Sequence, residues 1–167
     1  MSLDYTCYAL AKRPLTPQKL AKASPDWCIE FVDPENGKPL HKSRALPSFC
    51  VVWGCPRFAR LDLAALVRAA SGDSLRELER RSQLGSCALE IETDFVANSE
   101  FLAELPPRHR RVLAGAKSRY DTCSSASRGG NLSWPLQAAV CRAVALAVGG
   151  MLEEPQIGKF QAVSAKG

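Results

Sequence analysis

Apolar and polar side chains alternate at the start of the chain, and this pattern predicts a β-strand over residues 3–10. The side chains on its apolar side are Leu3, Tyr5, Cys7 and Ala9. A period of two with one apolar side is typical of a half-buried strand. Further strands are predicted over residues 27–32, 48–53, 87–95 and 119–123. The apolar character of residues 48–53 favours a place inside the sheet.

Helix-start signals lie between these strands. Thr16 precedes Pro17 and predicts an N-cap with proline in the first turn, and Asp62 predicts a second N-cap. Ser74 and Glu77 have the spacing of a capping box. A short helical turn is predicted over residues 99–105, and a helix from Pro107 to about residue 118.

The most apolar segment, residues 136–148, predicts a buried helix. Its valines recur at four-residue spacing, Ser133 is the predicted N-cap, and Gly149 and Gly150 end it. This segment is too short to span a bilayer and carries Arg142. Residues 151–160 predict an extended, hairpin-like tail.

Some predicted strands follow one another directly along the chain, and others are separated by predicted helices. This order favours an α+β protein with a mixed or antiparallel sheet and helices packed on it. The chain has 167 residues, a length that fits one domain with its own core. We therefore expect a single domain over residues 1–167.

The cysteines indicate the compartment. Their number, seven, is odd, and no basic-then-apolar signal peptide is seen at the N-terminus. A secreted disulfide framework favours an even count. We expect seven free thiols in a soluble cytoplasmic protein that does not contact a membrane.

The net charge of +5 is concentrated along the chain. Five basic residues and no acidic one lie between residues 106 and 119; without them the basic and acidic residues would balance. They are Arg108, Arg110, Arg111, Lys117 and Arg119. On a helical projection they flank an apolar arc made of His109, Val112, Leu113, Ala116 and Tyr120. The segment predicts a partner-binding surface, with a solvated helix face as the alternative.

Three carboxylates alternate with other residues over 89–94. Period two places Glu90, Glu92 and Asp94 on one face of a strand. Such a row could bind a basic partner or a divalent cation, or it could be the solvated face of an antiparallel strand.

Catalytic signatures are weak. Cys50 and Cys55 are separated by four residues rather than two, so neither a redox motif nor a zinc knuckle is indicated. We predict no catalytic residues, no metal and no cofactor. A cysteine nucleophile paired with His109, and an anion-binding backbone nest over residues 124–131, remain open alternatives.

The C-terminal part resembles a bacterial pattern. A helix runs into Gly149-Gly150, three residues separate this pair from Glu154-Pro155-Gln156, and Gly158 follows. This order is similar to that of small bacterial α+β proteins found near polymorphic or type VI secretion toxins, where such proteins serve as immunity proteins. The resemblance covers about a quarter of the chain and assigns no catalytic residue.

Three function classes remain. The first, which we favour, is a protein-binding module, specifically an immunity protein that neutralises a bacterial toxin acting in the cytoplasm. The second is a nucleic-acid-binding domain that uses the basic helix of residues 107–119, although exposed aromatics do not alternate with its basic residues. The third is a small enzyme with an unrecognised site.

Overall fold

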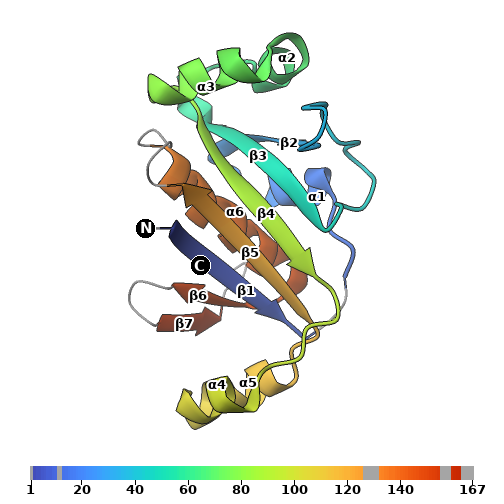
Figure 1. Ribbon diagram of the computed structural model, residues 1–167, viewed down its shortest axis with the longest axis vertical. Helices are drawn as coiled ribbons and strands as arrows, with labels where there is room; N and C mark the ends of the chain where they lie inside the picture. Colours follow the sequence, from blue (N-terminus) through green and yellow to red (C-terminus); the bar gives the residue numbers. More distant parts are fainter. Residues whose placement is uncertain (1, 11–12, 126–131, 155–158, 163–167) are drawn as a thin grey trace.

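An antiparallel sheet dominates the structure, a computed structural model that describes residues 2–10, 13–125, 132–154 and 159–162. Across these residues seven strands lie in the order β2-β3-β4-β5-β1-β6-β7 (Figure 1). Every pairing in the sheet is antiparallel. The strands are β1 (Ser2–Ala9), β2 (Trp27–Val32), β3 (Phe49–Pro56), β4 (Gly85–Glu92), β5 (Ser118–Ser125), β6 (Met151–Glu154) and β7 (Lys159–Ala162).

The helices complete an α+β fold, which confirms the predicted class and selects the antiparallel alternative. They are α1 (Pro17–Ala23), α2 (Leu63–Ala69), α3 (Gly72–Arg80), α4 (Ser99–Glu104), α5 (Pro107–Ala114) and α6 (Ser133–Val148). No helix in the described part of the chain is both long and apolar enough to cross a membrane.

The main core lies between α6 and the sheet. Leu136, Val140 and Val144 are fully buried there, together with residues of β1, β3, β4 and β5. Gly54 of β3 makes this packing possible, because a Cβ atom at that position would collide with the Leu136 side chain. Helix α1 packs beside α6 on the same face. The predicted central helix is thus confirmed.

Two glycines determine how the C-terminal end of α6 joins β6. Gly149 ends the helix in the left-handed conformation with φ of 66°, which glycine adopts without strain. At Gly150 a Cβ atom would lie 2.5 Å from the Cys7 sulfur, so this glycine lets β6 pair closely with β1. The Gly-Gly pair of the bacterial pattern therefore has a structural role.

The N-terminus of α6 differs from its prediction. Leu132, not Ser133, occupies the N-cap position. The Ser133 hydroxyl instead donates to the buried carboxylate of Glu79, 3.0 Å away, and the Ser86 hydroxyl donates to the same oxygen. A buried carboxylate needs such hydrogen-bond donors. The hydrogen bonds to Glu79 of α3 therefore link Ser133 of α6 and Ser86 of β4 to α3.

Among the described residues, helices cover the opposite face of the sheet only at its two ends (Figure 1). Helices α2 and α3 bury Val32 and Trp53 at one end. At the other end α4 and α5 pack on Tyr8 of β1. Between these two helical pairs the side chains of Asp4, Glu90 and Cys123 are exposed, whereas Thr6 is buried among its neighbours.

Several predicted boundaries need correction. The predicted N-caps Thr16 and Asp62 are confirmed, but the capping box at Ser74 is wrong. Helix α3 begins earlier, with Ser71 as its N-cap, and Glu77 forms ion pairs with Arg80 and Arg81 on the helix surface. Residues 126–131 of the possible anion nest and 155–158 of the bacterial pattern lie outside the described residues.

Candidate functional site

The basic segment is split between a helix and a strand. Helix α5 ends at Ala114 rather than near residue 118, because Gly115 caps it. Arg108 and Arg111 are exposed on this helix. Arg110 is used within the fold, since its guanidinium donates to the carbonyl oxygens of Ala103 and Leu105 at 3.0 and 3.1 Å and caps the end of α4.

The remaining basic residues of the segment lie beyond the helix. Lys117 is exposed and its backbone joins the end of β1 through the Ala9 carbonyl. Arg119 belongs to β5, where it forms an ion pair of 3.0 Å with Asp121. Tyr120, predicted on the apolar arc of the helix, is instead buried in the main core. The five basic residues therefore do not share one surface.

Two of the three alternating carboxylates share a strand face. Glu90 and Glu92 are exposed on β4, on the side away from α6. Asp94 follows the end of this strand, which stops at Glu92 rather than at Phe95. The register of β4 and β5 places Glu90 opposite Asp121 and Glu92 opposite Arg119. The acidic row and Arg119 thus meet on one surface.

This surface, called here the open face, is the side of β1, β4, β5 and β6 opposite α6, and Phe49 of β3 borders it. Its central row runs across the sheet because adjacent strands place the partners in register. In order from β3 to β6 the row contains Phe49, Glu90, Asp121, Thr6 and Glu153. At about 4.8 Å between strands, the row is roughly 19 Å long.

Most of the charge on the open face is negative. Among the described residues of these four strands, its charged side chains are Asp4, Glu90, Glu92, Asp121, Glu153 and Arg119. Asp121 is held by Arg119 and by the Thr6 hydroxyl, which donates to it at 2.6 Å. The remaining carboxylates make this face a surface of negative potential.

The negative charge of the open face helps to raise the pKa of two neighbouring groups, Cys123 and Tyr8. Burial raises the pKa of Cys123, and the charges of Asp4, Glu90 and Asp121 raise it further. Burial, followed by the charge of Glu153, raises the pKa of the Tyr8 phenol, whose hydroxyl donates to the Glu153 carboxylate at 3.0 Å. The phenol therefore stays protonated and holds Glu153 in place.

A hollow of about 400 Å³ lies at the α4 end of the open face. Phe95 and Phe101 form an aromatic wall against Tyr8, with ring centroids 5.4 and 6.3 Å from the tyrosine ring. Val96 lines the same hollow and is 84% exposed. The open face thus combines carboxylates with exposed apolar area.

All seven cysteines are free, as predicted. Burial raises the pKa of Cys50 to about 12 and that of Cys55 to about 11. It also raises the pKa of Cys7, Cys87 and Cys141. A nucleophilic cysteine needs a lowered pKa, because the thiolate is the reactive form. Burial therefore disfavours the reactive form of these five thiols. Within the described ranges no group of three or more potential metal ligands is found.

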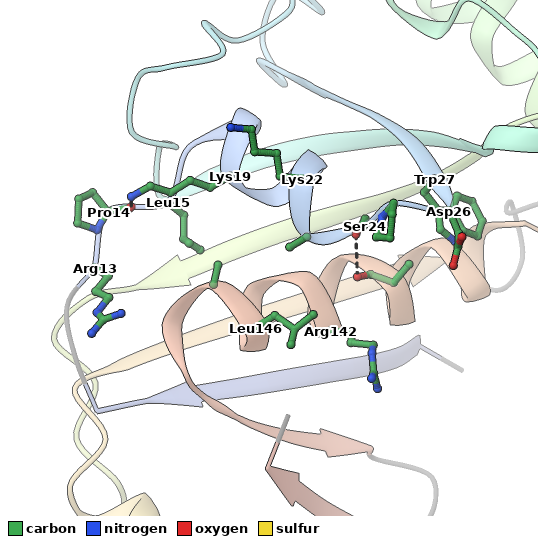
Figure 2. Close-up of a pocket in the computed structure, with 14 residues that line it drawn as sticks. Arg13, Pro14, Leu15, Lys19, Lys22, Ser24, Asp26, Trp27, Arg142 and Leu146 are labelled. Carbon is green, nitrogen blue, oxygen red and sulfur yellow. Dashed lines mark hydrogen bonds between the residues drawn. The ribbon is translucent and has the colours of Figure 1, made fainter. Parts of the chain in front are cut away.

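A second surface, called here the basic groove, lies between α1 and α6 on the other side of the sheet. It encloses about 940 Å³. Figure 2 shows Arg13 before α1, Lys19 and Lys22 on α1, and Arg142 on α6. Apolar side chains form its walls, among them Leu15, Ala139, Leu146 and Ala147. Asp26 is the acidic residue among the described residues that line it.

Sequence reasoning missed the basic groove, although part of its signal was present. Arg13, Lys19 and Lys22 lie in a stretch without acidic residues between Asp4 and Asp26. Arg142, the one charged residue of α6, joins them only through the packing of α6 beside α1. A single charge in an otherwise apolar helix marks the strip that faces solvent.

No family model, no curated protein and no solved structure matches this chain.

Proposed function

We propose that this chain is a protein-binding module, and that the open face of its sheet is the surface that contacts the partner. The observation that carries this proposal is the exposed sheet surface between α2–α3 and α4–α5. It has a row of carboxylates bordered by Phe49 and by the aromatic hollow. Carboxylates around exposed apolar side chains suit a partner with a basic surface, since complementary charge steers association.

The bacterial pattern narrows this proposal to a toxin-immunity protein in the cytoplasm. A toxin that acts on nucleic acid needs basic residues in its active cleft. An acidic sheet surface could cover such a cleft. The protein would then act by occluding the toxin rather than by chemistry of its own.

Affinity purification of the tagged protein from its source cells tests the proposal. A basic protein partner should be retained at physiological salt and released at high salt, where charge pairs are screened. The double variant Glu90→Lys/Glu92→Lys should lose this partner. Both side chains are exposed, so the fold should remain intact.

A matched control carries the same charge change elsewhere. Glu35 and Asp73 are also exposed, and Glu35→Lys/Asp73→Lys should bind the partner as the wild type does. Expression of the partner alone should arrest growth, and co-expression of the wild type, but not of Glu90→Lys/Glu92→Lys, should restore it. Equal recovery of the partner by both double variants would contradict a role for the open face.

A further inference from the structure

The basic groove carries more charge than its surroundings neutralise. Within the described part of the chain, the ion pairs lie on α3 and β5, and none includes Arg13, Lys22 or Arg142. Lys19 donates to the Pro14 carbonyl at 3.3 Å (Figure 2), a bond that leaves its positive charge without a carboxylate. Among the described residues that line the groove, four are therefore cationic and one is acidic.

The walls of the groove are apolar. Ala139, Leu146 and Ala147 form the α6 side, and Leu15 and Ala23 belong to the opposite side. The Ser24 hydroxyl in this wall already donates to the Ala139 carbonyl. A bound molecule would therefore meet hydrocarbon inside the groove and cations at its edge.

The cations are spread along the groove rather than gathered around one point. The α6 wall runs from Ala139 to Ala147, which corresponds to about 12 Å at the helical rise of 1.5 Å per residue. Arg13 and Trp27 lie towards opposite ends of the groove in Figure 2. A single small anion could not contact all these cations at once, whereas an extended molecule with several anionic groups could.

We propose that the basic groove binds an acidic, amphipathic segment of another protein. Leucine-like side chains of that segment would pack on the α6 wall, while its carboxylates meet Arg13, Lys19, Lys22 and Arg142. Arginine pairs with carboxylates in a two-pronged geometry. An acidic helix of about two turns, or about four extended residues, matches the length of the wall.

Single-stranded nucleic acid is the competing anionic ligand, and the lining disfavours it. Such sites stack successive bases on aromatic side chains. Trp27 is the only aromatic among the described residues that line the groove, and it also packs against the core. This inference is independent of the open face, which lies on the other side of the sheet and has the opposite charge.

Fluorescence anisotropy with two labelled octapeptides tests the proposal. The Glu-Leu peptide, Glu-Leu-Leu-Glu-Glu-Leu-Leu-Glu, places its leucines on one face of a two-turn helix, and the Glu-Ser peptide has serine in place of each leucine. The Glu-Leu peptide should bind the wild-type protein at physiological salt and at least tenfold more tightly than the Glu-Ser peptide. Amide chemical shifts should change at Arg13, Lys22 and Leu146 when it binds. No saturable binding of the Glu-Leu peptide would overturn the proposal.

Charge reversal locates the binding. Arg13→Glu/Arg142→Glu should weaken Glu-Leu binding at least tenfold, whereas Arg108→Glu/Arg111→Glu, the same charge change on α5, should leave it within twofold. All four side chains are exposed, and circular dichroism checks the fold; the milder Arg13→Gln/Arg142→Gln replaces any variant that unfolds. Equal weakening by both pairs would overturn the proposal. So would tighter binding of a labelled dodecamer of deoxythymidine that competes with the peptide.

Discussion

The contact between Gly54 of β3 and Leu136 of α6 allows a double-mutant test of how α6 sits on the sheet. Leu136 is fully buried, and truncation of such a leucine to alanine lowers the free energy of unfolding by roughly 2–5 kcal/mol. Gly54→Ala introduces a methyl group where the Leu136 side chain already lies. Overpacking of this kind typically costs about 1–3 kcal/mol.

The double variant Gly54→Ala/Leu136→Ala should lose less stability than the two single variants together. The new methyl group at position 54 occupies part of the space that Leu136 leaves, so the coupling free energy should be about 1 kcal/mol or more. Urea denaturation gives the four unfolding free energies. For a chain of this length, each kcal/mol also lowers the melting temperature by roughly 2–4 °C.

Val144→Ala is the matched control for this cycle. Val144 is equally buried in α6 but lies about 12 Å along the helix from Leu136. Gly54→Ala and Val144→Ala should therefore be additive within about 0.5 kcal/mol. Additivity between Gly54→Ala and Leu136→Ala would refute the described seating of α6, and with it the wall of the basic groove.

Other predictions test the core, the titrating groups and the thiols. Val144→Asp would bury an unpaired charge and should leave the protein insoluble or unfolded; a soluble variant with unchanged melting would mean that the helix is misplaced. Burial raises the pKa of Glu30, so ionisation of this group destabilises the fold as pH rises above the unfolded value of 4.5. Glu30→Gln should therefore raise the melting temperature at pH 7, and the gain should vanish below about pH 4.5; a gain that persists at low pH would exclude this cause. Iodoacetamide should modify exposed Cys123 in the native protein and leave Cys87 and Cys141 untouched until urea unfolds it, when mass spectrometry should find seven modified sites; early modification of Cys141 would contradict its burial.

The sequence pattern predicted the elements whose signals are local. Thr16 and Pro17 begin α1, and the long apolar run with Gly149 defines most of α6. The predicted helix caps were wrong where a polar side chain could form more than one kind of hydrogen bond or ion pair. Ser133 has the chemistry of an N-cap, but it serves the buried Glu79. Glu77 has the chemistry of a capping-box partner, but it pairs with Arg80 and Arg81.

The candidate surfaces were harder to predict, because they depend on strand order. The alternation of Glu90 and Glu92 correctly indicated a common strand face. Their meeting with Thr6 and Glu153 required β1 and β6 to join β5 in one sheet, and pairings between distant segments leave no local signal. The charge run around Arg110 pointed to one basic helix, whereas the fold divides it between α5 and β5.

Carboxylate footprinting of the complex is the most direct test of the open face as the partner-binding surface. The protein, alone and bound to the partner that co-purifies with it, is treated with a carbodiimide and glycine ethyl ester, and labelling is read by mass spectrometry. Glu90 and Glu92, both exposed in the free protein, should become protected in the complex, while Glu35 and Asp73 stay labelled. Unchanged labelling of Glu90 and Glu92 in a complex that protects other carboxylates would contradict the proposed function.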